Sequence, residues 1–458
     1  SSWAFGMPHA RQPQPLTGRL SGRRQPMRRL LAAEAAQAEE AAKLSSVPQS
    51  TVNLVKNIVG AGMLSLPAGV AAFSSSQKAL VPSLSLTLLF GLLSAYGFVL
   101  IADACNRTGE TTYQGAWAKA VGKTTAIIPL VACLLKAGIG CVCFQMILGD
   151  CLSLMGGAVG LPALLRSRSA VILALTAGVL VPLCSMKSLA PLAKFSVLGV
   201  LSNVYIAFFV MLRALDGSYG AGSAMLKAVP VAPKLTAFAG SPWATVCDPG
   251  IAVLLSILST AFLAHYNAPL FYEQLAPSPS GDKAGRFLLV SVLGFSGAAL
   301  FFSAVMAGGF ATFGGHSLGL ILNNYAATDP LAFGARGAIA ISLITAYPIV
   351  FFSLRKQVVN LLGTTGADMS KNKPKTLTLG MIAVLTCLAL VLRDLGKIAA
   401  FAGACFGSFL IYVAPAMMVI GAQTKGIGPP VKGAGGWFNR VLQLAIIPLG
   451  TALGCIGA

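Results

Sequence analysis

The chain alternates between long apolar runs and short polar segments over most of its length. Runs such as SLSLTLLFGLLSAYGFVLIADAC (83–105) and IAVLLSILSTAFLAHYNAPLF (251–271) are long enough to cross a hydrocarbon core of about 30 Å as a helix. Such runs predict eleven membrane-spanning helices, at residues 51–72, 79–102, 126–154, 169–186, 191–213, 247–270, 286–313, 333–355, 376–393, 396–420 and 437–457. We therefore expect an all-α polytopic membrane protein.

Two of these runs contain residues that interrupt a helix. The first run includes NIVGAGMLSLPAG (57–69), with Gly60 and Gly62 at its centre, and the sixth includes AHYNAPLFY (264–272), with Pro269. In a helix interior, Gly costs about 1 kcal/mol and Pro about 3 kcal/mol relative to Ala. Non-helical backbone at membrane depth is tolerated only where it is buried in protein or lines a cavity. Both runs are therefore predicted to break beside a cavity.

The two breaks lie five runs apart. This spacing predicts two inverted repeats of five helices each, followed by an eleventh helix. Gly and Pro also occur in membrane helices as kinks and packing points, which would explain a single break. Interrupted helices at matching positions in two halves instead indicate the binding site of a secondary transporter.

A broken helix exposes backbone groups of both polarities. The amides of Ala61, Gly62 and Met63 begin the resumed helix, where unpaired N–H groups and the positive end of the dipole suit a carboxylate. Carbonyls released before the two breaks suit an ammonium group or a small cation, and they belong to Ile58, Val59, Leu263 and Ala264. Together these groups predict a site for a zwitterionic amino acid.

The charge of the chain indicates its orientation in the membrane. The formal net charge is +20, from 33 Lys and Arg against 13 Asp and Glu. With the N-terminus in the cytosol, about two thirds of the basic residues fall on the cytosolic side, as the positive-inside rule expects. The charge therefore reflects topology and contact with membrane lipids, and we expect no nucleic-acid partner.

Residues 1–49 differ in composition from the rest. They are rich in Arg and Pro and predict a basic, disordered cytosolic tail, with an organellar targeting segment as the alternative. Residues 50–458 are predicted to form the transporter domain. The plasma membrane or a vacuolar or lysosomal membrane is the expected location, and another organellar membrane is the alternative.

Several segments, in order, resemble the amino acid/auxin permease family. They are NLVKNIVGAGMLSLPAG (53–69), TTYQGAWAKAVG (111–122), QMILGD (145–150), VPLCSMKSLAPLAKFS (181–196), FLAHYNAPLFYEQL (262–275), GGFATFG (308–314), TAYPIVFFSLRK (345–356) and LIYVAPA (410–416). The resemblance covers roughly residues 50–457. It implies a core like that of the bacterial leucine transporter, with helices 1 and 6 broken, and amino acid transport driven by a proton or sodium gradient.

The resemblance also implies where the substrate binds. The family's contacts to the substrate backbone fall on Gly60, Ala61 and Gly62 in helix 1, and on Phe262, His265 and Asn267 or their immediate neighbours in helix 6. Tyr266 is expected to shape the pocket around the substrate side chain. No acidic residue is evident in this pocket, which disfavours cationic amino acids and makes neutral ones the expected substrates.

The coupling ion is left open between a proton and sodium. Sodium-coupled members generally carry Asn four residues before the first glycine of the break, whereas this chain has Lys56 there, followed by Asn57. The Lys56 ammonium either replaces sodium, which favours protons, or extends to the membrane interface. Asn57 and the Ile58 carbonyl keep a sodium site possible, together with Ser342 and Thr345, which share a helix face.

Two titratable residues inside the predicted spans require a separate interpretation. His265 is the only histidine within a span, and either proton coupling or a structural role would explain it. Lys136 lies deep in the third span and is a further candidate for a functional charge.

Other functional classes have less support. A receptor built on a transporter fold is the first alternative and a channel the second. The sequence shows no P-loop, no His/Cys metal cluster and no Ser/His/Asp set, so we expect neither an enzyme nor a metal site beyond a possible sodium site. No cofactor is expected apart from the coupling ion, and the oligomeric state is left open.

Overall fold

The computed structural model describes residues 44–186, 196–278, 281–362, 373–428 and 433–457. Most of the predicted tail lies outside these ranges. The first described helix, α2 (Val47–Ile58), begins three residues before the predicted boundary at residue 50. Within the described ranges the structure is helical, and its only β pairing consists of two isolated bridges.

The eleven predicted spans all correspond to apolar helical segments. Among the described residues, eight helices are long and apolar enough to cross a membrane, α2 with Ala61–Ala71 forms a bent ninth, and the fourth and ninth spans are shorter helices. In chain order the segments are α2 with α3 (Leu66–Ala71), α4 (Leu80–Thr108), α6 (Ile127–Ala158), α8 with α9 (Arg168–Leu175, Val181–Cys184), α11 (Ser196–Leu215), α13 with α14 (Ile251–Ala261, Ala268–Gln274), α15 (Lys283–Phe313), α16 (Pro330–Leu361), α17 (Lys373–Val391), α18 with α19 (Leu395–Ala402, Ala414–Thr424) and α20 (Gly433–Gly457).

Acidic side chains fix the starts of several helices. Asp282 accepts a hydrogen bond from the Gly285 amide at 2.8 Å at the start of α15, and Asp329 accepts one from the Leu331 amide at 2.9 Å at the start of α16. Asp394 likewise caps α18 three residues after α17 ends, so the ninth and tenth spans are joined by a short connection. The segment 111–122, which carries part of the family resemblance, contains a short helix before the third span, α5 (Tyr113–Ala120).

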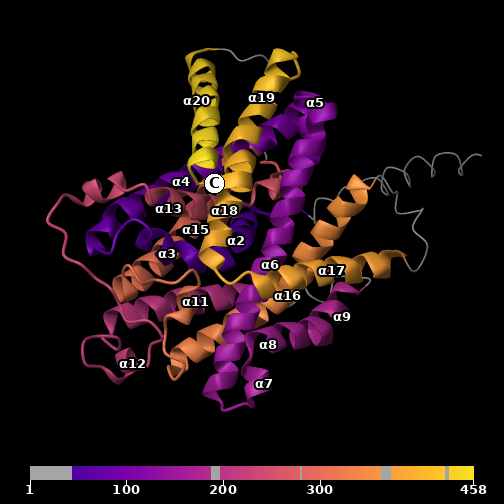
Figure 1. Cartoon of the computed structure of the whole chain (residues 1–458). Coiled ribbons are helices and arrows are strands. Elements are labelled where there is room, and N and C mark those ends of the chain that lie inside the picture. Colours follow the sequence, from indigo (N-terminus) through magenta and orange to yellow (C-terminus); the bar gives the residue numbers. More distant parts are fainter. Residues whose placement is uncertain (1–43, 187–195, 279–280, 363–372, 429–432, 458) are drawn as a thin grey trace, which may run out of the picture.

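The helices form two groups with a cavity between them. In the first group, α15 packs against α4 and α2, and α13 packs against α3. In the second group, α6 packs against α16, α8 and α17. Helix α11 contacts both α15 and α16, and α18 lies against α13 and α6, so these two helices bridge the groups (Figure 1).

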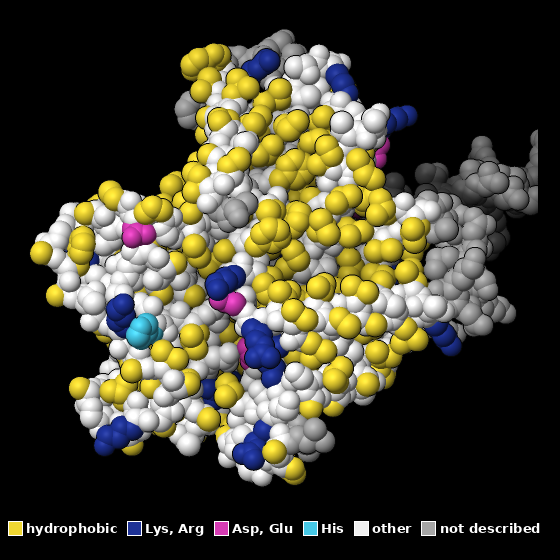
Figure 2. Space-filling model, in the orientation of Figure 1, with side chains coloured by type: hydrophobic (Ala, Val, Ile, Leu, Met, Phe, Trp, Pro, Cys, Tyr) yellow, Lys and Arg dark blue, Asp and Glu magenta, His cyan; other side chains and the backbone are white. Residues whose placement is uncertain are grey.

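Burial differs strongly between central and peripheral helices. In the most apolar stretch, 67% of the residues are buried in α13–α14 and also in α18–α19, against 22% in α20. On the face shown in Figure 2, hydrophobic side chains cover a broad area over α6, α17 and α19, and charged side chains lie at its margins. This distribution suits a surface in contact with lipid.

Candidate functional site

The first helix breaks at the predicted glycines. Helix α2 ends at Ile58, Val59 and Gly60 are extended, and the chain resumes as a short 3₁₀ helix, Ala61–Ser65. The resumed segment Ala61–Ala71 is inclined by 47° to α2. The Met63 amide donates to the Gly60 carbonyl at 3.2 Å, so it is not free as the sequence suggested. This bond arises because a 3₁₀ helix links each residue to the third one before it. The amides of Ala61 and Gly62 begin that helix, where no intrahelical acceptor precedes them.

The sixth helix breaks opposite the first. Helix α13 ends at Ala261, residues 262–264 are not helical, and α14 resumes after a 3₁₀ turn at His265–Asn267. Pro269 stands in the first turn of α14, where its missing N–H group leaves no bond unmade. Gly62 packs directly on α13, because a Cβ atom on Gly62 would lie 3.2 Å from the Cα atom of Ala261. The two breaks therefore face each other.

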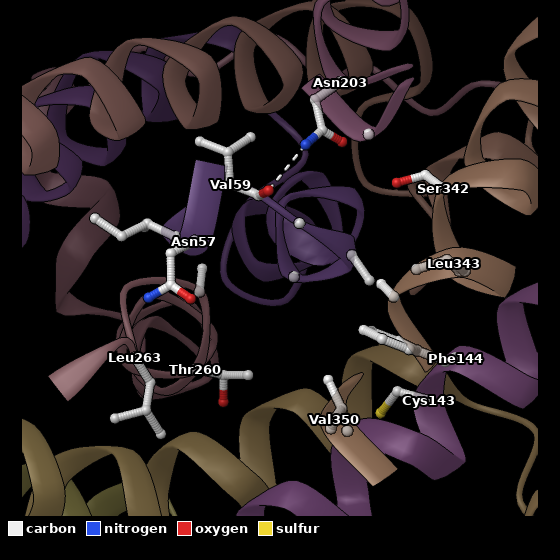
Figure 3. A pocket seen from close by; sticks show the side chains of 18 of the residues that line it. Asn57, Val59, Cys143, Phe144, Asn203, Thr260, Leu263, Ser342, Leu343 and Val350 are labelled. Atoms are coloured by element: carbon white, nitrogen blue, oxygen red, sulfur yellow. Dashed lines mark hydrogen bonds between the residues drawn. The ribbon is translucent and has the colours of Figure 1, made fainter. Parts of the chain in front are cut away.

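A cavity of about 500 Å³ lies at the two breaks. Its lining combines α2, the 3₁₀ helix and α13–α14 on one side with α6 and α16 on the other, and α11 and α18 complete it. Figure 3 shows Asn57, Thr260 and Leu263 on one side of the first break, with Phe144, Leu343 and Val350 across from it. Among the described lining residues there are two lysines and no carboxylate.

Most of the predicted site residues line this cavity. The lining includes Lys56, Asn57, Ile58, Gly60, Ala61, Gly62, Tyr266, Ser342 and Thr345. The other four, Met63, Phe262, His265 and Asn267, are absent from the lining. Met63, Phe262 and His265 are fully buried. The Asn267 amide donates to Asn57 Oδ1 at 3.1 Å, so it touches the site through a residue that lines it.

His265 packs in the protein interior. Its Nε2 atom lies 2.9 Å from the Ser94 carbonyl oxygen of α4, and its ring contacts Phe98 and Phe295. Phe262 likewise packs against Phe302, with ring centroids 4.8 Å apart. These contacts hold the break in α13 against α4 and α15, which corresponds to the structural alternative for His265.

Asn203 is a residue of the site that the sequence analysis missed. Its Nδ2 atom donates to the released carbonyl of Val59 at 2.8 Å, as Figure 3 shows. Its Oδ1 atom is buried and has no hydrogen-bond partner in the described part of the chain. One turn earlier on α11, a Cβ on Gly199 would lie 3.2 Å from the Ser342 hydroxyl. The available signal was a single Asn in the apolar stretch GVLSNVYIAFF (199–209).

The two predicted hydroxyls of α16 differ in their bonding. Thr345 donates to the carbonyls of Ile341 and Ser342, at 3.1 and 2.9 Å, and so bonds its own helix. Ser342 faces the cavity beside Asn203 (Figure 3). The side-chain oxygen atoms of Asn203 and Ser342 therefore both lie near the end of α2, beside the first break.

Lys136 also lines the cavity. Its ammonium group lies 3.3 Å from the Tyr266 hydroxyl and 4.7 Å from the centre of the Tyr266 ring. Lys136 is on α6 and Tyr266 follows the break in the sixth helix, so this contact joins the two helix groups across the cavity. The position suspected from the sequence therefore places a positive charge in the site.

The cavity reaches solvent on the side where α2 begins. Asn53 and Asn57 belong to the lining and are exposed. At the opposite end, the segment between α15 and α16 packs on α18, because the backbones of Gly319 and Gly396 leave no room for a side chain between them. Asn323 of this segment also donates to Asp150 Oδ2 at 3.1 Å, and Asp150 pairs with Arg168. The far end is therefore closed.

Three hydrogen bonds join α2 and the residue Ser45 just before it to α14 and the residue Ala276 just after it. The Ser45 amide donates to the Gln274 carbonyl at 2.8 Å, and the Ala276 amide donates to the Ser45 carbonyl at 3.1 Å. At the other end of α2, the carboxamides of Asn57 and Asn267 are joined, as described above. The helix beside the open end is thus fastened to α14 at both of its ends.

Comparison with known proteins gives consistent matches over nearly the whole chain. A family model described as transmembrane amino acid transporter protein matches residues 43–457. A putative sodium-coupled neutral amino acid transporter 11 of Danio rerio is 27% identical over 374 residues, which cover 81% of this chain and 78% of the relative. Vacuolar amino acid transporter 2 of Saccharomyces cerevisiae is 24% identical and covers 81% and 76%, and human solute carrier family 38 member 8 is 27% identical and covers 86% and 89%.

The fold is similar to that of a solved transporter. The inward-facing conformation of Mhp1 matches with a TM-score of 0.55 over 91% of both chains, at 11% identity. At that identity the likeness concerns the fold alone, and it confirms the leucine-transporter-like architecture with broken helices 1 and 6 that the sequence predicted.

Proposed function

Because the chain belongs to the transmembrane amino acid transporter family, we propose that it is a secondary active transporter that works by alternating access. The family and the relatives named above are transporters and not enzymes. The observation that carries the proposal is the cavity at two facing helix breaks. Such a cavity offers amides at Ala61 and Gly62 to a substrate carboxylate, and backbone carbonyls at Ile58 and Leu263 to its ammonium group.

We propose that the substrates include neutral amino acids. The Danio rerio relative is named for neutral amino acids, which supports this choice. Ile139, Phe144, Leu343 and Val350 give the lining an apolar part that suits an uncharged side chain. The described lining contains two lysines and no carboxylate, so a cationic side chain in the cavity would be repelled.

Transport is proposed to depend on a proton or sodium gradient. The unpartnered Asn203 Oδ1 atom and the Ser342 hydroxyl offer oxygen ligands for a small cation beside α2. Lys56 lines the cavity one turn before Gly60 and offers an ammonium group in the same region. The oxygen atoms favour sodium and the lysine favours protons, so a direct measurement must separate the two ions.

The described conformation is proposed to be open to the cytosol. The cavity reaches solvent where α2 begins, and the distribution of Lys and Arg predicts the N-terminus on the cytosolic side. The plasma membrane and a vacuolar or lysosomal membrane are both proposed locations, and the yeast relative is named as vacuolar.

The purified full chain in liposomes tests the proposal. Labelled amino acids are supplied one at a time, with proton and sodium gradients imposed separately. We expect saturable uptake of at least one neutral amino acid above its equilibrium level under one of the two gradients. Sodium-driven uptake that ignores pH would exclude proton coupling, and proton-driven uptake without sodium would exclude sodium coupling.

Two other outcomes would replace the proposal. Specific binding of an amino acid without net uptake would indicate a receptor. Electrical conductance without saturable counterflow would indicate a channel. Absence of uptake of every amino acid under both gradients would contradict the transporter assignment.

A further inference from the structure

The cavity carries a positive charge that a neutral amino acid leaves without a counter-ion. Lys56 and Lys136 belong to its described lining, and no Asp or Glu does. An ammonium group taken partly out of water is costly unless a partner compensates it. The asymmetry therefore points to a partner that is brought in from outside.

Of the two lysines, Lys136 is the one whose ammonium group has defined contacts with the described residues of the cavity, both of them with Tyr266. A lysine ammonium has three N–H donors, and the Tyr266 hydroxyl accounts for one of them at 3.3 Å. The Tyr266 ring lies under the same group at 4.7 Å, and no carboxylate of the described chain forms an ion pair with it. Tyr266 thus holds the ammonium group in place without neutralising it.

The position of Lys136 suits contact with a substrate side chain. Residues 136, 139, 140, 143 and 144 of α6 all line the cavity, and their spacing places them on one helix face. The breaks in the first and sixth helices serve the two charged ends of the amino acid backbone. The face of α6 lies across the cavity from them, where the side chain of a bound amino acid would extend.

On the condition that the proposed function holds, we propose that the cavity also accepts, and prefers, amino acids whose side chain ends in a carboxylate, with Lys136 as the ionic partner. A carboxylate converts the unpaired ammonium group into a charge-assisted hydrogen bond. A carboxamide of the same size offers only a neutral oxygen. A cationic side chain would add repulsion in a site partly shielded from water.

Competition between amino acids of equal size tests the proposal. The uptake of a labelled neutral amino acid into liposomes is measured with increasing concentrations of an unlabelled competitor. The competitors are compared in pairs, glutamate with glutamine and aspartate with asparagine. We expect the carboxylate member of each pair to inhibit at a concentration at least fivefold lower than its carboxamide. Labelled glutamate should itself be taken up.

Charge substitutions then test the role of Lys136. In Lys136→Gln the ratio of glutamate to glutamine uptake should fall at least tenfold, and Lys136→Arg should largely retain the ratio of the unmodified chain. The matched control is Lys375→Gln, which removes an exposed lysine at the start of α17, outside the cavity lining, and should leave the ratio unchanged. An unchanged melting temperature in detergent shows that each variant is folded.

The possible failures can be told apart. If neutral amino acids are taken up but neither glutamate nor aspartate inhibits, the preference is overturned and the proposed function stands. If glutamate is preferred and Lys136→Gln keeps that preference, the assignment to Lys136 is overturned. If no amino acid is taken up by the unmodified chain, both proposals fail.

Discussion

The two glycines of the first break differ in what surrounds them. Nothing lies within 4 Å of a Cβ atom built on Gly60, and this residue lines the cavity. Gly62 instead touches Ala261 of α13, so a side chain there would push two helices apart. Gly60 thus leaves open volume in the cavity, whereas Gly62 allows the two breaks to approach each other.

We predict that Gly60→Leu blocks transport without unfolding the protein. The new side chain would occupy the cavity beside the free amides, so uptake should fall at least about tenfold. Its melting temperature in detergent should stay close to that of the unmodified chain. Gly62→Leu should lose uptake as well and should also melt at a lower temperature, because it overpacks against α13.

Gly380→Leu provides the control for Gly60→Leu. Gly380 is an exposed residue of α17 with nothing within 4 Å of its Cβ position, and it lies outside the transport cavity. This variant should transport normally. Normal uptake by Gly60→Leu would show that the substrate does not occupy the space in front of Gly60.

Among the helices, α11 and α16 are fastened at the closed side by a buried charge network. Arg213 at the end of α11 pairs with Asp329, the cap of α16, at 2.6 Å, and Tyr219 donates to the same carboxylate at 2.9 Å. The Asp329 side chain is fully buried. Burial acts to raise the pKa of Asp329, but the hydrogen bonds from Arg213 and Tyr219 outweigh it and hold that pKa below the ordinary 3.8.

We predict that Asp329→Asn lowers stability by about 2 kcal/mol, because it removes the buried carboxylate to which Arg213 and Tyr219 donate, and Arg213 keeps only its more exposed ion pair with Asp216. The folded pKa of Asp329 is lowered, so its contribution is fully present above pH 3.8 and is lost only as the pH falls through the lowered folded value. The melting temperature in detergent should therefore be lower for the variant than for the unmodified chain by the same amount from pH 5 to 8. A difference that disappears within that range would contradict the ion pair.

The sequence predicted those features of the helices that depend on local chemistry. The breaks at 59–60 and 262–264 lie near the Gly and Pro residues that predicted them, whereas α5 lies in a segment that was singled out only by its resemblance to the family. The partners of His265 and Asn203 lie 171 and 144 residues away along the chain, so no local pattern predicts the contact with the Ser94 carbonyl or the Val59 carbonyl. The Met63 amide was assigned wrongly because the resumed helix is of the 3₁₀ type and not an α-helix.

At the scale of the whole molecule, the helix order fixes which loops share a side of the membrane. Cys247 lies in a short 3₁₀ helix, Pro242–Cys247, just before α13, and it is exposed. With the N-terminus in the cytosol and five spans before it, this helix lies on the opposite side. Asn106, in the N-glycosylation sequon NRT, is exposed near the end of α4, and the same proposed orientation would place it on the cytosolic side.

We predict that a membrane-impermeant maleimide labels Cys247 from the non-cytosolic face of sealed vesicles, and that Cys247→Ser removes this label. Asn106 should carry no glycan, because glycans are attached on the non-cytosolic side. In vesicles that expose the non-cytosolic face, labelling of Cys247 only after permeabilisation would contradict this orientation. A glycan on Asn106 would contradict it as well.

The double fastening of α2 to α14 has a mechanical consequence. Because these hydrogen bonds join α2 and α14 at both ends, we expect the two helices to move together as one rigid unit, which contains the half of each broken helix next to the open end of the cavity. The width of the open end and the shape of the cavity at the two breaks would then change together. Binding of a substrate at the breaks would thereby directly affect whether the cavity stays open to solvent.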